Sequence, residues 1–413
     1  MIPRLPTPDS TLSLLREGYA FGSRRFEQLG DDTFRTRVGG ISMVWGRGRE
    51  ATELSYDRER ITRRRAMPPS VKHLLQDAGS VQGLDDAAHH HRKSLFRAVL
   101  IGEGPGTAGR ILAEEWQAAV PRWERRERIV LHDEAQVLLT RTALRFAGID
   151  LAGTDVAERA RELALMVDRV ATLGPSNWAA RARRRRTERW AGDLVVATRS
   201  GVLHPPTGTA LAEIAAHRDL DGALLPVEVA AVELLNVLRP LVAVSRFVAF
   251  AAHALVTHGR WADAFADGDD VDLRGFVQEV RRFYPFFPAV PGRVRVPTPW
   301  HGETLQPGDW FMADLYGTNH HPGLWAEPER FDPARFRSWD GDVLTLVPQG
   351  AGDVATGHRC PGELVTIHLM EEAVRQLTRG MRYVVPAQDL SIRLNRFPGL
   401  PREGVQITDI RQR

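Results

Sequence analysis

The stretch Gly357-His358-Arg359-Cys360-Pro361-Gly362-Glu363 holds the only cysteine in a chain of 413 residues. One thiol cannot form an intramolecular disulfide or a metal site built from several cysteines. Free cysteine is commonly a small buried hydrophobe, so inert packing is one interpretation. The neighbouring residues favour another. Gly362 lets backbone approach a flat partner closely, and Pro361 suits the first position of the helix that the pattern over Leu364–Arg379 predicts.

The charges around Cys360 favour metal binding. A sulfur at a helix N-terminus, close to His358 and Arg359, is biased toward thiolate, the form that binds iron. Haem iron held by one cysteine thiolate is a known ligation mode, in which the thiolate pushes electron density toward O–O cleavage. We therefore expect Cys360 to be the metal ligand of a haem.

The composition is that of an ordinary globular protein, with 43% hydrophobic residues, 26% charged residues and a net charge of +3. This charge indicates no polyanionic partner, and the one basic run, Arg181–Arg186, is more often a solvated helix face than a nucleic-acid site. Met1–Ser10 lacks the apolar core of a signal peptide, and no apolar stretch of about 18 residues indicates a membrane span. Because one unpaired cysteine fits a reducing compartment, we expect a cytoplasmic protein.

Helix-period patterns dominate from about residue 88 onward, whereas the N-terminal part contains short β-like runs such as Ile41–Trp45. The longest pattern runs from Pro226 to His258, about 50 Å if continuous at roughly 1.5 Å per residue, and is apolar on nearly every face. The sequence predicts a mainly α protein with a minor β region and a long central helix. Further predicted helices span Ala108–Ala119, Ile129–Phe146, Ala157–Val170 and Arg181–Ser200.

Arg239-Pro240 lies in the middle of this apolar pattern. Proline inside a helix removes a hydrogen bond and kinks the helix at a cost of ~3 kcal/mol, and a buried arginine keeps its charge and must be paired or solvated. Two unfavourable features side by side indicate a site, and the natural partner of a guanidinium is a carboxylate. A salt bridge within the chain is the alternative. Arg246, about 10 Å further along, competes for the role, but the kink should open space beside Arg239.

Glu279 and Arg282 lie at positions i and i+3 of a predicted helix face. Such a pair is usually solvated and contributes little. Its place ahead of Phe331–Phe336, which contains Arg335, and of the cysteine loop favours a structural lock. Neither interpretation makes the pair catalytic.

The Cys360 loop, Glu279-x-x-Arg282 and Arg335 together resemble the cytochrome P450 superfamily. A narrower resemblance, to the bacterial fatty-acid peroxygenase subfamily, runs from about Leu14 to the C-terminus. It implies a P450-like haem-thiolate fold with residues 1–413 as a single peroxygenase domain. The segments that carry it are Asn236–Pro240, Gln278–Phe286, Leu315–His320 and Gly357–Glu363.

The resemblance implies a role for individual residues. Cys360 would be the axial ligand of haem b, and Arg239 would bind a fatty-acid carboxylate above it, with Pro240 shaping the gap. Gln82 matches a distal position where histidine is associated with decarboxylation, so glutamine favours hydroxylation. The positions that resemble haem-propionate contacts are Arg63, His89, Lys93 and His358. His89 and Lys93 also lie at i and i+4, facing the same way.

The chain departs from the common oxygen-using P450 pattern at its central helix. Arg239-Pro240 stands where those proteins carry an acidic residue and a threonine that relay protons. The cysteine loop lacks the usual preceding phenylalanine, and Gln349–Thr356 is longer and richer in glycine; both features resemble the peroxygenase subfamily. Gln76 and Phe287 stand where phenylalanine and glycine are expected, which bears on chain length and regioselectivity.

The implied reaction is hydroxylation of a long- or medium-chain fatty acid at the α or β carbon, with hydrogen peroxide as co-substrate and no redox partner. The substrate carboxylate, held by Arg239, would act as the acid–base group. Decarboxylation to a terminal alkene, a reductase-dependent monooxygenase and a non-enzymatic haem or fatty-acid sensor are the alternatives. A metal site at His89-His90-His91 is disfavoured, because adjacent helical histidines point in different directions.

Overall fold

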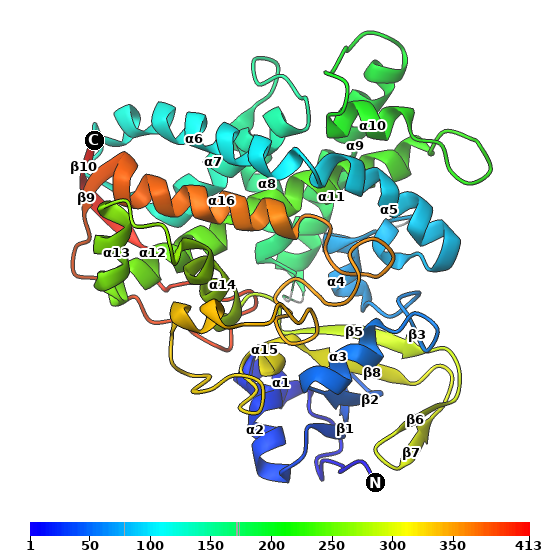
Figure 1. Cartoon of the computed structure of the whole chain (residues 1–413). Helices are drawn as coiled ribbons and strands as arrows, with labels where there is room; N and C mark the ends of the chain where they lie inside the picture. The colour runs from blue at the N-terminus through cyan, green and yellow to red at the C-terminus, as the bar shows by residue number, and fades with distance from the viewer. Residues whose placement is uncertain (78, 171, 173) are drawn as a thin grey trace.

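The computed structural model describes residues 1–77, 79–170, 172 and 174–413. Figure 1 shows a sheet-containing part around the N-terminus and a larger helical part that carries the C-terminus. The mainly α prediction with a minor β region is therefore confirmed.

The main sheet has the strand order β1-β2-β8-β5-β3. β2 and β8 pair in parallel, whereas the other neighbours pair antiparallel. The predicted run Ile41–Trp45 is confirmed as part of β2. A small sheet joins β4, β10 and β9, and β6 pairs with β7. The strands are β1 (Thr33–Val38), β2 (Ile41–Gly46), β3 (Ile61–Thr62), β4 (Arg128–Val130), β5 (Ala289–Val294), β6 (Thr298–Trp300), β7 (Glu303–Leu305), β8 (Trp310–Asp314), β9 (Met381–Val384) and β10 (Gln406–Gln412).

The helices follow the apolar periodicity of the sequence, and both ends of each predicted helix lie within six residues of the ends of an observed one. Those before the central region are α1 (Thr11–Glu17), α2 (Ala20–Leu29), α3 (Gly48–Tyr56), α4 (Pro69–Leu75), η1 (Val81–Gly83), α5 (Asp86–Leu100), α6 (Gly104–Trp123), α7 (Leu131–Phe146), α8 (Val156–Asp168), α9 (Pro175–Arg199) and α10 (Ala210–Ala216). Those from it onward are α11 (Val227–Ala243), α12 (Ser245–Thr257), α13 (Gly259–Ala266), α14 (Leu273–Phe283), α15 (Leu315–Asn319), η2 (Pro333–Arg337), α16 (Glu363–Arg375) and η3 (Gln376–Gly380).

The long central helix is present but interrupted. The predicted span Pro226–His258 contains α11 and α12, which are separated at Val244 rather than at Pro240. The helix runs through the proline, and the backbone N–H of Val244 donates to Leu241 O at 3.3 Å, one residue short of the helical register. The helical assignment thus breaks at Val244 and not at Pro240, and the bend expected at Pro240 stays a prediction.

α16 follows the cysteine loop, as predicted, and packs along α6 (Figure 1). Gly362 is its N-cap, so Pro361 precedes the helix and does not take its first position. The helix ends at Arg375, and the predicted continuation to Arg379 is a π-helical turn.

The principal apolar core fills the space between the helices, with Trp116, Leu234, Phe250 and Met370 almost fully buried. A smaller core around Phe311 backs the main sheet. Within the described part of the chain, no helix has both the length and the apolarity needed to cross a bilayer.

Candidate functional site

The cysteine loop presents its thiol at the entrance to α16. The backbone N–H of Cys360 donates to Gln349 O at 3.2 Å, and Gln349 Nε2 lies 3.9 Å from Sγ. Gly362 has a φ of −89°, which any residue can adopt, so the backbone conformation does not require glycine here. A Cβ at Gly362 would lie 3.8 Å from Sγ of Cys360, so glycine keeps the space beside the thiol open.

The protein groups around Cys360 do not favour the thiolate as expected. Burial raises the pKa of the Cys360 thiol, and the nearby Glu363 carboxylate adds to the rise. The positive charge of Arg359 is committed to Glu363, at 2.6 Å, and the His358 ring faces Asp85. A bound metal cation would supply the missing stabilisation, because coordinated thiols lose their proton.

A buried carboxylate ties the loop to α14. Glu363 accepts from Arg359 on one oxygen and from Arg281 on the other, and Arg281 also reaches Gln349 Oε1 at 3.1 Å. Arg281 is 1% exposed. This contact could not be predicted from the sequence beyond a basic residue beside Arg282, because the partners are 82 positions apart.

Two buried cations lie near the loop without an anionic partner in the described structure. Lys93, on α5, donates to the carbonyls of Gly357 and Arg359. Arg63 donates to Pro291 O at 2.6 Å and to Ser55 O at 2.7 Å. Burial lowers the pKa of Lys93 to about 8, which still leaves it mostly cationic at neutral pH. Burial also lowers the pKa of Arg63.

The predicted histidines lie together beside these cations. The His89 and His358 ring centroids are 4.1 Å apart, and His358 Nε2 is 3.6 Å from Asp85. Burial lowers the pKa of His89 to about 3 and that of His358 to about 4, so both rings are neutral donors. Asp85 could not be assigned to the site from the sequence. Its only signal was its place just ahead of the helix that carries His89.

These residues fit a haem. One free thiol, two buried cations without carboxylate partners and two neutral imidazoles match a metal centre carrying two carboxylates. His90 and His91 stay partly exposed, and among the described residues no group of histidine, cysteine or carboxylate side chains could hold a free metal ion.

Arg239 is buried on α11 and contacts only neutral oxygens. Its Nη2 donates to Asn236 Oδ1 at 3.1 Å, and its Nη1 lies 3.5 Å from Leu74 O. It is 4% exposed and forms no ion pair with a described carboxylate. Burial, with repulsion from Arg184, lowers the pKa of Arg239 to about 9, so the side chain stays charged at neutral pH.

Arg246 is fully committed to the fold. It pairs with Asp168 of α8 and donates to Gly399 O at 2.9 Å. The competing assignment of the ligand role to Arg246 therefore loses its basis, because its charge is already compensated.

Pro240 follows Arg239 on α11 and is exposed, whereas Gln82 lies on a different element. Gln82 lies in η1, whose first residue, Val81, donates its N–H to Glu233 of α11 at 2.9 Å. Gln76, at the end of α4, accepts from Arg184 at 3.0 Å, and Phe287 is 42% exposed.

Glu279 and Arg282 form the predicted structural lock. The two side chains are fully buried and joined by contacts of 2.7 and 2.8 Å, and Arg335 Nε lies 3.3 Å from Glu279. Arg282 also donates to Asn319 O at 2.8 Å. Because both charges are satisfied within the protein, the lock has no free group for catalysis.

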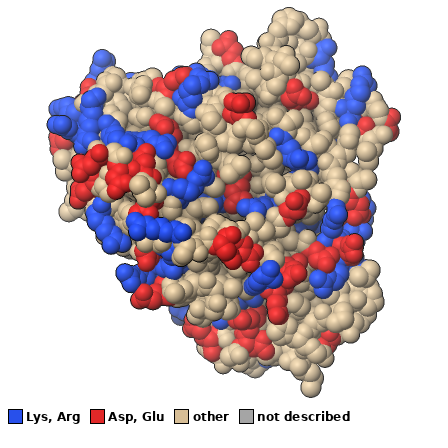
Figure 2. All heavy atoms as spheres, in the orientation of Figure 1, with Lys and Arg blue, Asp and Glu red and all other residues tan. Residues whose placement is uncertain are grey.

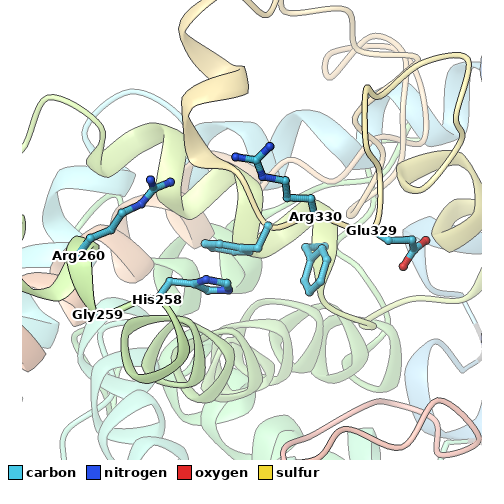
Figure 3. Close-up of a pocket in the computed structure, with 7 residues that line it drawn as sticks. His258, Gly259, Arg260, Glu329 and Arg330 are labelled. Carbon is cyan, nitrogen blue, oxygen red and sulfur yellow. The ribbon is translucent and has the colours of Figure 1, made fainter.

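A hollow of about 700 Å³ lies away from all of these residues, at the junction of α12 and α13. Figure 3 shows His258 with Arg260 and Arg330 on either side of it. No predicted site residue lines it. The remaining members are Gly259, Phe283, Glu329 and Phe331.

The family model described as Cytochrome P450 matches residues 273–380. Vinorine hydroxylase of Rauvolfia serpentina is 28% identical over 148 residues, 34% of this chain and 30% of that protein. A nicotine N-demethylase of Nicotiana tomentosiformis is 28% identical over 137 residues, 31% of this chain and 25% of that protein. The chain thus matches less than a third of the length of these curated relatives.

Solved structures match along their whole length. A variant of cytochrome P450 OleT in complex with arachidonic acid has a TM-score of 0.97 and 33% identity, covering 100% of this chain and 99% of that one. Cytochrome P450EX alpha with myristic acid gives 0.96 and 38%, covering 100% of both chains. Cytochrome P450SP alpha with (R)-ibuprophen gives 0.95 and 41%, covering 98% and 100%. With this likeness added to the site geometry, the chain belongs to the cytochrome P450 superfamily, in its bacterial fatty-acid peroxygenase subfamily, and is a haem oxidoreductase.

Proposed function

We propose that this protein hydroxylates fatty acids at the α or β carbon with hydrogen peroxide, and that Arg239 holds the substrate carboxylate. The observation that carries the proposal is the buried, charged guanidinium of Arg239, which contacts only neutral oxygens. A desolvated cation gains most from an anion that reaches it, and the arginine fork suits a carboxylate. The similar proteins crystallised with arachidonic and myristic acid support a fatty acid as that anion.

Haem b held by Cys360, with Arg63, His89, Lys93 and His358 around its propionates, would supply oxidation of an unactivated C–H bond at the expense of hydrogen peroxide. Since peroxide already carries the required electrons, the proposal needs no redox partner.

The proton transfer is assigned to the substrate. Glu233, the acidic residue on α11 nearest to Arg239 in sequence, has both carboxylate oxygens engaged by Val81, Arg92 and Asn236. The fatty-acid carboxylate at Arg239 can accept a proton and return it, which is the role of a general acid–base.

Anchoring also accounts for the position of attack. With its carboxylate fixed at Arg239, the substrate presents the carbons next to the head group to the oxidant, so α or β hydroxylation follows from orientation. We assign to Pro240 the shaping of the gap and to Gln82 the distal tuning that favours hydroxylation over decarboxylation.

The test is peroxide-driven turnover of myristic acid by the holoenzyme and by Arg239→Ala. Loss of a charged two-point contact should reduce turnover about 100-fold or more. In Arg239→Ala, a short carboxylic acid that fills the space left by the arginine side chain should partly restore peroxide-driven oxidation of a substrate that has no carboxylate. Arg183→Ala, an exposed arginine on α9, is the matched control and should keep full activity.

Product analysis separates the alternatives. Unimpaired fatty-acid turnover in Arg239→Ala would overturn the proposal. Terminal alkene as the main product would indicate decarboxylation. Turnover with a reductase but not with peroxide would indicate a monooxygenase, and a spectral shift without product would indicate a sensor.

A further inference from the structure

A buried hydrogen-bond network lies behind Arg239, centred on Glu233. Glu233 lies six residues, about 1.7 turns, before Arg239 on α11 and has 0% exposure. Its Oε1 accepts from Val81 N at 2.9 Å and from Arg92 Nη1 at 3.0 Å. Its Oε2 accepts from Asn236 Nδ2 at 2.8 Å. A fully buried carboxylate is stable only when so compensated.

Asn236 connects this carboxylate to Arg239. Its Nδ2 donates to Glu233 and to Ser80 Oγ, at 3.0 Å, whereas its Oδ1 accepts from Arg239 Nη2 at 3.1 Å. An amide has donors on one side and an acceptor on the other. If it flipped, its oxygen would face the Glu233 carboxylate and its NH₂ would face the guanidinium. The charge of Glu233 therefore selects the orientation in which Asn236 can hold Arg239.

The network also joins two helices that carry different parts of the site. Arg92 lies on α5 between His89 and Lys93, and its second contact is with Asp219 at 2.8 Å. Glu233 thus ties the helix of the propionate candidates to the helix of the carboxylate-binding arginine, and through Val81 it holds η1 and Gln82.

We propose that Glu233 is the positioning residue of the fatty-acid site: through Asn236 it fixes the guanidinium of Arg239 in the direction that receives the carboxylate. The inference rests on the proposed function of Arg239. Glu233 does not touch the substrate. Its negative charge alone would weaken binding of the carboxylate at Arg239, whereas its positioning of Arg239 strengthens that binding.

The two possible roles of Glu233 predict changes in fatty-acid affinity of opposite direction, so a binding titration distinguishes them. As a bare negative charge, Glu233 competes with the fatty acid for Arg239, so its removal should tighten binding. As a positioning group, its removal should weaken binding. Glu188 is the matched control, because it also acts electrostatically on Arg239 but pairs with Arg184 and does not contact Asn236.

The experiment titrates myristic acid into the holoenzyme and into Glu233→Gln, Glu188→Gln and Arg239→Ala, followed by the haem spectrum. We expect Glu233→Gln to raise Kd about tenfold and to change the α-to-β product ratio, while Glu188→Gln leaves Kd equal or lower. Asn236→Leu should raise Kd similarly, and the double variant Glu233→Gln/Asn236→Leu should add little, because both act through one amide.

Each result has one meaning. Equal or tighter binding by Glu233→Gln with an unchanged product ratio would overturn the positioning role. Additive losses in the double variant would do the same. Unweakened binding by Arg239→Ala would instead refute the proposed function itself. If Glu233→Gln does not fold, the Asn236→Leu variant, with its own Kd and product ratio, decides: an unchanged Kd would overturn the inference.

Discussion

The protein buries arginine in two contrasting ways. On α14, next to the cysteine loop, Arg282 and Arg281 meet carboxylates of Glu279 and Glu363. On α11, Arg239 meets only neutral oxygens. A buried charge with an ionic partner stabilises one conformation of the protein. A buried charge without a partner raises the free energy of the ligand-free protein, and an anion that binds to it removes that cost. The contrast separates the structural lock from the proposed substrate site.

The distribution of charge on the surface adds nothing to this contrast. Figure 2 shows acidic and basic side chains interspersed on the visible face. Of the basic run, Arg184 is buried against Glu188 at 2.7 Å, and Arg186 lies 3.5 Å from Glu158. The run is thus partly neutralised, as expected for a helix face.

The largest effect is expected at the lock. Glu279→Ala leaves Arg282 buried without its carboxylate, which should lower the free energy of unfolding by about 3–5 kcal/mol. Urea unfolding measures it. Glu327→Ala, which removes a carboxylate from the exposed Arg330 pair at 2.8 Å, is the control and should change stability little. Similar stability in the two variants would refute the lock.

Arg239 should contribute to fatty-acid binding but not to the stability of the fold. Arg239→Met should weaken fatty-acid binding about 100-fold, or about 2.7 kcal/mol, without lowering the free energy of unfolding, because an uncompensated buried charge is removed. Calorimetry of the ligand-free enzyme and a binding titration together check it. Destabilisation comparable to that of Glu279→Ala would place Arg239 with the structural arginines.

A smaller effect is expected at Arg246. Asp168→Asn removes its carboxylate partner but leaves the contact with Gly399 O at 2.9 Å, so stability should fall by about 1–2 kcal/mol. Fatty-acid turnover should change no more than about twofold. A loss of binding as large as that of Arg239→Met would mean that Arg246 also receives the carboxylate.

The smallest effect is a pH dependence. Burial, aided by Arg282, lowers the pKa of His320 to about 3, and burial, aided by Arg246, lowers that of His132 to about 4. Above an unfolded-state pKa of about 6.5 this contributes no pH dependence. Below it the unfolded chain binds a proton that the histidine in the folded protein does not bind, so stability falls, by about 1.4 kcal/mol per histidine at pH 5.5.

Unfolding measured from pH 7.5 to 5.5 tests this, with His320→Gln as the comparison. The variant should show a shallower decline than the parent protein. Parallel declines would mean that His320 titrates normally beside Arg282.

Local patterns gave much of the fold and part of the site. The helices were predictable because apolar periodicity acts within a few turns, and the Glu279–Arg282 pair because its members are one turn apart. The position of the helix break was not, because the sequence around Val244 carries no glycine or proline at the break itself. The start of α16 was predicted to within one residue, but Gly362 rather than Pro361 borders the helix.

What the sequence by itself determined is the inventory: one thiol in a loop before a helix, and one arginine in an apolar helix beside a proline. Only the tertiary structure decided their electrostatic state. Burial raises rather than lowers the pKa of Cys360, and Glu233 reaches Arg92 across 141 positions. Desolvation and ion pairing depend on which groups the fold brings together, and residues that are distant in sequence carry no local record of that proximity.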